Sequence, residues 1–150
     1  MDPESGAIAE KEFQRAQKEL AEGNVLAALA CLERALKIWD APTWYSFLGF
    51  CIAKERGHVT KALELCQTAI QHEPDNPVHE YFLGKVHLVA GHKAEALQAL
   101  REGMNKGGTP EIEQLLKTIG MRKPPVIPFL SRDNFLNKYL GKIFGRLGLR

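Results

Sequence analysis

The stretch GHVTKALELCQTAIQHEP, residues 57–74, carries a pattern that recurs once upstream and once downstream. In each copy an alanine and a leucine follow a glycine after five and six residues, and a further small residue comes seven positions after the alanine. Copies 34 residues apart give the sets Gly23, Ala28, Leu29, Ala35, then Gly57, Ala62, Leu63, Ala69, then Gly91, Ala96, Leu97, Gly103. This period predicts an all-α solenoid of helix–turn–helix units.

The physical roles of these positions follow from their size and spacing. Glycine ends a helix well because it takes the left-handed C-cap conformation without steric cost. The alanines are expected on the inner face of the next helix, where a larger side chain would hold neighbouring helices apart. The leucine and the residue three positions later would fill the space between helices, and that later residue is Leu32, Cys66 or Leu100. Each unit has apolar surface on both flanks, so it must stack on a neighbour.

The second copy resembles the tetratricopeptide repeat most closely. The family pattern is matched by Trp44, Leu48–Gly49, Ala62 and Pro74, with Cys66 in the second aromatic position. The spacing departs from the family once, since three residues rather than two separate Trp44 from Leu48. An extra residue or a bulge is therefore expected in the first helix of this repeat. In the third copy Leu83–Gly84 fits, while Glu80 replaces the tryptophan and His87 replaces the aromatic residue.

The resemblance and the turn signals predict the domain organisation. Residues 1–8 are expected to be loose, and a solenoid is expected over 9–120. Its parts are repeats at about 9–42, 43–76 and 77–110 and a closing helix at 111–120. In the first repeat, helices are expected at about 8–21 and 25–38. A proline-rich linker at 121–130 and a basic amphipathic helix at 131–150 complete the prediction.

Charge is distributed unevenly along the chain. Residues 1–120 hold 13 basic and 17 acidic side chains, and residues 121–150 hold seven basic side chains and one acidic side chain, Asp133. The chain has no run of 18 apolar residues, so no membrane span is predicted. The acidic N-terminal residues do not resemble a secretory signal. The three cysteines, Cys31, Cys51 and Cys66, fall in helical patterns and are expected to be reduced and buried. These features favour a cytoplasmic protein.

No pattern typical of an enzyme is present. The chain has no phosphate-binding loop, no HExxH and no GxSxG motif, and no Cys–His spacing suited to a metal. Of the five histidines, His87 and His92 are five residues apart, which is wrong for two ligands on one helical face. We therefore expect a non-catalytic protein with no cofactor and no metal.

The resemblance implies a concave groove, lined by the first helices of the repeats, that binds peptides or helices. Carried onto this sequence, the partner-binding positions are Phe13, Gln17, Phe47, Phe50, Tyr81, Phe82, Lys85, Leu88 and Val89. Some of these aromatic residues could instead belong to the core. The lysine and asparagine clamp that holds a C-terminal carboxylate in this family is missing, because its positions hold Phe13, Gln17, Phe47, Val78 and Phe82. An apolar groove would prefer an amphipathic helix.

The C-terminal segment has the pattern of such a helix. One apolar stripe holds Phe135, Leu136, Tyr139, Leu140, Ile143, Phe144 and Leu147, and a cationic row holds Lys138, Lys142 and Arg146. Left in water, the stripe would exceed the apolar patch usual for a monomer. It could dock on the repeats in the same chain or in a homodimer, bind another protein, or enter an anionic membrane surface. Nucleic acid is a poor fit for so apolar a stripe. The sequence thus predicts an interaction scaffold, with a peripheral membrane adaptor as the alternative.

Overall fold

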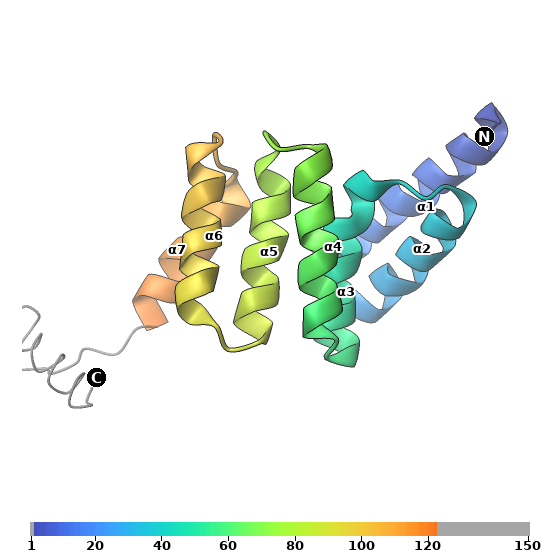
Figure 1. Ribbon diagram of the computed structural model, residues 1–150. Coiled ribbons are helices and arrows are strands. Elements are labelled where there is room, and N and C mark those ends of the chain that lie inside the picture. Colours follow the sequence, from blue (N-terminus) through green and yellow to red (C-terminus); the bar gives the residue numbers. More distant parts are fainter. Residues whose placement is uncertain (1, 123–150) are drawn as a thin grey trace, which may run out of the picture. The chain divides into compact units, whose positions relative to one another are not determined.

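The structure is a computed structural model that describes residues 2–122. Those residues form seven α-helices and one 3-10 turn (Figure 1). The helices are α1 (Pro3–Ala21), α2 (Val25–Ile38), α3 (Tyr45–Arg56), α4 (Val59–His72), α5 (Pro77–Val89), α6 (Lys93–Asn105) and α7 (Pro110–Arg122), and the 3-10 turn is η1 (Pro42–Trp44). The chain divides into two compact units after Glu113, within α7, and α1 to α6 belong to the first unit.

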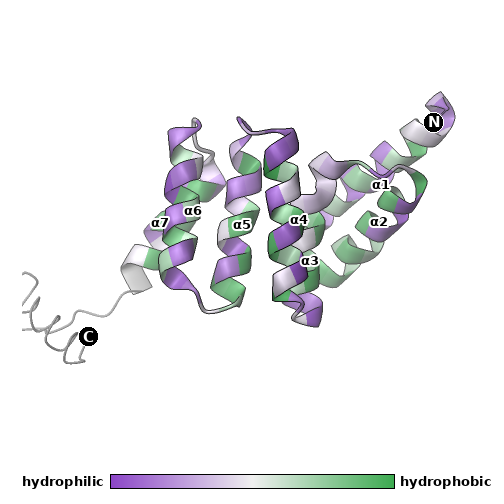
Figure 2. Cartoon of the chain, viewed as in Figure 1, coloured by the Kyte–Doolittle hydropathy of each residue, from purple (hydrophilic) through white to green (hydrophobic). Residues whose placement is uncertain are grey.

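The first unit is built from three antiparallel helix pairs, as the 34-residue period predicts. Helix α1 packs on α2, α3 on α4, and α5 on α6. Successive pairs meet because α3 contacts both α2 and α5, and α4 contacts α5. In Figure 1, α5 lies between α4 and α6. The faces of α4 and α6 turned toward the viewer in Figure 2 carry mainly hydrophilic residues, which leaves their apolar residues for the helix interfaces.

The periodic positions have the roles that the pattern predicts. Gly23, Gly57 and Gly91 have φ values of 83°, 71° and 80° and follow α1, α3 and α5. The periodic small residues of α2 and α4 are fully buried, and so are Ala96 and the three residues Leu32, Cys66 and Leu100. The periodic leucines are less uniform, since Leu29 is buried but Leu63 and Leu97 are only half-buried.

Close helix packing depends on a glycine in α3 and in α5. A Cβ atom placed on Gly49 would lie 2.8 Å from the carbonyl oxygen of Ala62 in α4. A Cβ atom on Gly84 would lie 2.9 Å from the side chain of Leu100 in α6. Ile112, in the first turn of α7, is fully buried, and its side chain would meet a Cβ atom placed on Gly103 of α6.

The extra residue expected in the second repeat lies in the last turn of α3. Helices α1 and α5 each end with a backbone hydrogen bond that spans five residues. These bonds run from Asn24 N to Glu19 O and from His92 N to His87 O, and both are 2.8 Å long. After α3 the corresponding bond runs from His58 N to Ile52 O, spans six residues and is 3.4 Å long. The helix therefore absorbs one additional residue before Gly57, as the sequence predicted.

The prediction of a loose N-terminus over residues 1–8 is wrong. Helix α1 begins at Pro3 because Asp2 caps it, accepting a hydrogen bond of 2.6 Å from the Ser5 amide. Pro3 suits the first helical position, and Glu4 favours the positive end of the helix dipole. The predicted bounds of 25–38 for the next helix are confirmed. Helix α7 also continues to Arg122, two residues into the predicted linker.

Candidate functional site: a groove along the first helices of the repeats

A pocket of about 240 Å³ opens between the first helices of the three repeats. Its lining is contributed by α1, α3, α5 and the segment that starts α7. The lining residues are Gln17, Leu20, Ala21, Phe47, Val78, Tyr81, Phe82, Lys85, Thr109 and Glu111. Five of the nine partner-binding residues expected from the sequence therefore line one pocket, namely Gln17, Phe47, Tyr81, Phe82 and Lys85.

Two rings of the pocket floor, Phe47 and Phe82, belong to an aromatic ladder that continues into the core. Phe47 of α3 lies between Phe13 of α1 and Phe82 of α5, with ring centroids 4.9 and 4.6 Å away. Phe13 also stacks on Trp44 at 4.5 Å, with the ring planes 9° apart. Because these contacts join the first helices of all three repeats, the rings that shape the pocket also hold the repeats together.

Four expected binding residues do not line the pocket. Phe13 and Phe50 are 8% and 6% exposed, so they belong to the core. Leu88 is half-buried and Val89 is 39% exposed at the end of α5. Phe47 and Phe82, at 9% and 6% exposed, belong to the same core although they also line the pocket. The role of all nine residues in binding stays a prediction.

Lys85 places a positive charge beside the apolar floor. Its Nζ atom lies 4.2 Å from the ring centroid of Phe50 and 5.1 Å from that of Tyr81. Burial lowers the pKa of Lys85, and the charge of nearby Lys54 acts in the same direction, against an opposing effect of Cys51. No carboxylate oxygen among residues 2–122 lies within 4.0 Å of this ammonium group, so it is held by aromatic faces rather than by an ion pair.

Thr109 and Glu111 line the pocket but were not expected from the sequence. Thr109 accepts a hydrogen bond of 3.1 Å from the Ile112 amide and so caps the start of α7. The Pro110 that follows it is typical of a helix start, but the proximity of this turn to Tyr81 depends on tertiary packing. Burial raises the pKa of Tyr81, and the charge of Glu111 raises it further.

A buried hydrogen-bonded chain, also not expected, links the second and third repeats. Ser46 Oγ of α3 lies 2.7 Å from His79 Nδ1 of α5, and His79 Nε2 lies 2.7 Å from Glu73 Oε1. The order serine, histidine, carboxylate is that of a hydrolase triad, but Ser46 is 0% exposed and no substrate can reach it. The 35-residue offset from Leu48–Gly49 to Leu83–Gly84 relates Trp44 to His79 rather than to Glu80, which was expected in the tryptophan position, and this offset was the available signal.

The cysteines are confirmed as free and buried. Burial raises the pKa of Cys51 and of Cys66 to about 12, so both thiols are protonated and unreactive near neutral pH. Elsewhere in residues 2–122, no three metal-ligating side chains come together. None of the helices described is both long and apolar enough to cross a bilayer.

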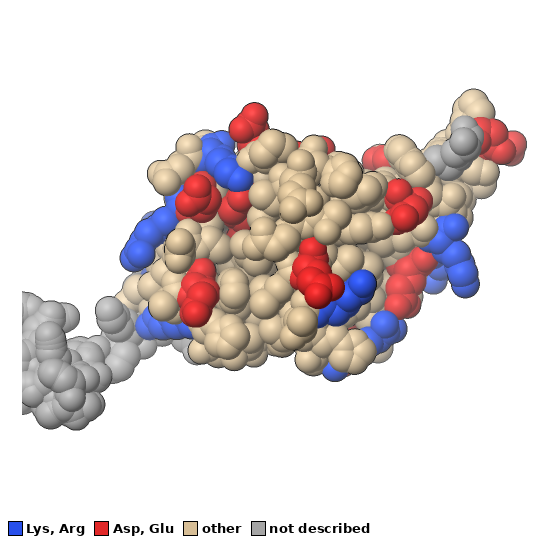
Figure 3. Space-filling view, viewed as in Figure 1, with Lys and Arg blue, Asp and Glu red and all other residues tan. Residues whose placement is uncertain are grey.

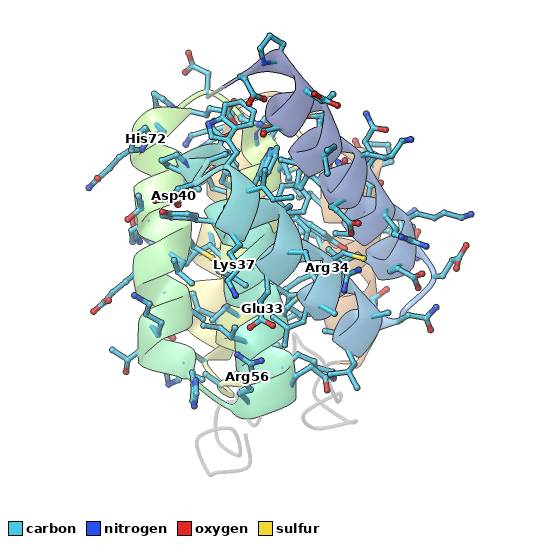
Figure 4. The ribbon with its side chains drawn as sticks, turned by 90° about the vertical axis from the view of Figure 1, so that its right-hand side faces the viewer. Glu33, Arg34, Lys37, Asp40, Arg56 and His72 are labelled. Atoms are coloured by element: carbon cyan, nitrogen blue, oxygen red, sulfur yellow. The ribbon has the colours of Figure 1, made fainter. Side chains whose placement is uncertain are left out.

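Two surface ion pairs lie away from the groove, and the first of them links two repeats. Glu33 of α2 and Arg56 of α3 approach to 3.0 Å (Figure 4). Arg34 of α2 bonds to Glu12 of α1 at 3.2 Å. Both contacts are partly exposed, so they contribute little to stability compared with the aromatic ladder.

Comparison with known families agrees with this architecture. A tetratricopeptide repeat model matches residues 53–119, which include the three helices α4, α5 and α6. Residues 53–119 therefore have the sequence pattern of tetratricopeptide repeats. Repeats of this kind are generally non-catalytic modules of protein–protein interaction.

A solved structure extends the likeness in fold beyond residues 53–119. The crystal structure of the Sgt2 TPR domain from Aspergillus fumigatus superposes with a TM-score of 0.59. The match covers 83% of this chain and 87% of that chain at 20% identity, which shows a shared fold. No curated protein matches the chain. Residues 123–130 of the linker predicted at 121–130, the apolar stripe and the cationic row lie outside the described residues.

Proposed function

We propose that the protein is a non-catalytic scaffold that binds one apolar face of a helix or peptide in the groove of α1, α3 and α5. The observation that carries this proposal is the pocket floored by Phe47 and Phe82 and flanked by Tyr81. Apolar side chains of an amphipathic helix would enter it, since such grooves bind the i, i+3 and i+4 positions of a partner helix. A non-enzyme role agrees with the general use of this repeat family.

The polar groups of the pocket would orient the bound segment. Gln17 is exposed at one side and Lys85 lies at the other, over the ring of Phe50. Polar groups around an apolar floor fix the direction and register of a ligand more than its affinity. The lysine and asparagine clamp for a C-terminal carboxylate is missing from the pocket, where those positions contribute Gln17, Phe47, Val78 and Phe82. An internal helical segment is therefore the better ligand.

The chain itself offers an occupant, the apolar stripe of residues 135–147. Residues 1–120 carry a net charge of −4 and residues 121–150 a net charge of +6, which favours their association. Docking would remove seven large apolar side chains from water, at roughly 1.5–3 kcal/mol for each residue fully buried, before ordering costs. The groove could be in the same chain, which would regulate access, or in a second copy, which would build a homodimer.

The decisive experiment compares the full chain with a chain ending at residue 122. Light scattering and chemical cross-linking are measured for both, and Tyr81→Ala is compared with a matched control, Leu26→Ala. Leu26 is 67% exposed on α2 and does not line the pocket. We expect truncation to change the oligomeric mass measured by light scattering or the cross-link pattern. Tyr81→Ala should have the same effect, and Leu26→Ala should have none. No change on truncation would contradict the docking of the C-terminal segment.

The alternative function is a peripheral membrane adaptor anchored by the same C-terminal segment. The cationic row Lys138, Lys142 and Arg146 beside the apolar stripe supports it, because basic amphipathic helices bind anionic bilayers. Flotation with vesicles of anionic or neutral lipid distinguishes the two functions. Salt-sensitive flotation that Phe144→Glu abolishes would favour the membrane adaptor, whereas no flotation would favour the scaffold. Either function is compatible with a cytoplasmic location.

A further inference from the structure

A second cavity, of about 400 Å³, lies on the opposite side of α5 from the groove. Its floor is the row Glu80, Leu83 and His87, which are three and four residues apart on one face of α5. Helices α4 and α6 form its two walls. The wall residues are Gln67 and Ile70 of α4, Glu95, Gln98, Ala99 and Glu102 of α6, and Lys106 just after α6.

Glu80 is a buried carboxylate that is only half satisfied. The side chain lines the cavity, and the residue is 3% exposed. Its Oε2 atom forms an ion pair with Lys106. Its Oε1 atom is buried and has no hydrogen-bond partner among the described residues. A buried carboxylate oxygen without a donor is costly, so the site favours a ligand that brings one.

His87 adds a second unsatisfied group to the same floor. Its Nδ1 atom is buried and has no partner in the described part of the chain. Burial lowers the pKa of His87, and the neighbouring His92 lowers it further, against an opposing effect of Glu95. At neutral pH the ring is therefore uncharged and does not repel a cation.

The walls favour a cation with an apolar stem. Glu95 and Glu102 are seven residues apart on α6, and both are exposed at the rim. Figure 3 shows acidic side chains gathered over α6 on this face. Ile70, Leu83 and Ala99 supply apolar surface between the acidic groups. Lys106 is the only cation among the lining residues, and Glu80 already holds it.

We propose that this cavity binds an arginine side chain presented by a protein partner. The methylene stem would lie against Leu83 and Ile70, and the guanidinium would donate to Glu80 Oε1 and to the rim carboxylates. Arginine suits the site better than lysine because its planar group has five donors and is weakly hydrated. This site uses the face of α5 that the groove does not, so it is independent of the proposed function.

The test uses two small probes with the full chain. N-acetyl-arginine methylamide is titrated while amide NMR spectra are recorded, and the citrulline analogue serves as the neutral isostere. We expect the arginine probe to saturate shifts at Leu83, His87 and Gln98, with a dissociation constant on the order of 1 mM. The citrulline probe should leave these signals unchanged.

Variants locate the binding. Glu80→Gln and Glu102→Gln should each weaken binding of the arginine probe about tenfold or more, as expected for loss of a charge-assisted hydrogen bond. Glu64→Gln, an exposed change on α4 outside the cavity, should not. If Glu80→Gln prevents folding, Glu102→Gln still decides the question. Equal responses to both probes, shifts confined to the groove, or insensitivity of binding to Glu102→Gln would overturn the proposal.

Discussion

The starts of α3 and α5 occupy equivalent places in successive repeats, yet they are held by different chemistry. At the start of α3, Trp44 is 6% exposed and stacks on Phe13. Thirty-five residues later His79 is 1% exposed and bonds to Ser46 and Glu73. The tryptophan needs only apolar surface around it, whereas the histidine needs two partners in the right places. The same repeat geometry therefore tolerates either kind of interface.

The largest effect is expected from Trp44→Ala. Removing this ring leaves a cavity beside Phe13 and should lower the free energy of unfolding by about 3–5 kcal/mol. The matched control is Trp39→Ala, because Trp39 is 43% exposed and its ring centroid lies 5.4 Å from that of Trp44. Urea denaturation of both variants measures the difference. Equal losses for the two tryptophans would contradict an interface based on burial at Trp44.

The next largest effect is expected from His79→Ala, which should lower the free energy of unfolding by about 2–4 kcal/mol. The cost of a cavity is added here to that of unsatisfied hydrogen bonds. Ser46→Ala should cost less, since it removes one partner only. A double-mutant cycle on Ser46 and His79 measures their coupling in the same denaturation assay. Strictly additive losses would show that the contact of 2.7 Å between these side chains does not stabilise the fold.

The close-packing glycines of α3 and α5 provide a finer comparison. Gly49→Ala should cost about 1–3 kcal/mol, because the new methyl group meets a backbone oxygen that cannot rotate away. Gly84→Ala meets the buried side chain of Leu100, which can shift in part, so its loss should be smaller than that of Gly49→Ala, while the gain in helix propensity of about 1 kcal/mol is common to both. Thermal melts of both variants check the order. A larger loss at Gly84 would contradict this account of the packing.

The smallest effect is expected in the pH dependence of stability. Burial tends to raise the pKa of Glu73, but hydrogen bonds from His79 and Asn76 outweigh it and hold that pKa below its ordinary value of 4.5. A lowered pKa in the folded state contributes stability above pH 4.5 that is lost as the pH falls through the folded value. Glu73→Gln should flatten this acid limb of the stability curve. An unchanged limb would mean that the carboxylate does not stabilise His79.

The periodic features of the fold could be predicted from the sequence because they depend on local rules. Glycine at a C-cap, alanine at a helix contact and the extra residue in α3 all follow from spacing. The start of α1 does not follow from an apolar pattern, which residues 1–8 lack, but from the Asp2–Pro3 cap.

The groove could be predicted only in part. Its helix faces follow from the repeat, but whether an aromatic ring on them is buried, as Phe50 is, depends on how neighbouring repeats pack. The bonding partners of His79 and the orphan oxygen of Glu80 depend on residues from other helices or loops. No periodicity within α5 reveals them.

A photo-cross-linking residue placed at position 81 of the full chain tests the central claim most directly. Tyr81 lines the groove and is partly exposed, so a benzophenone side chain there would react with whatever occupies it. Mass spectrometry should locate the cross-links within residues 135–147, and the same side chain placed at position 26 should give none there. Efficient photoactivation with no cross-link from position 81 to residues 135–147 would contradict the account.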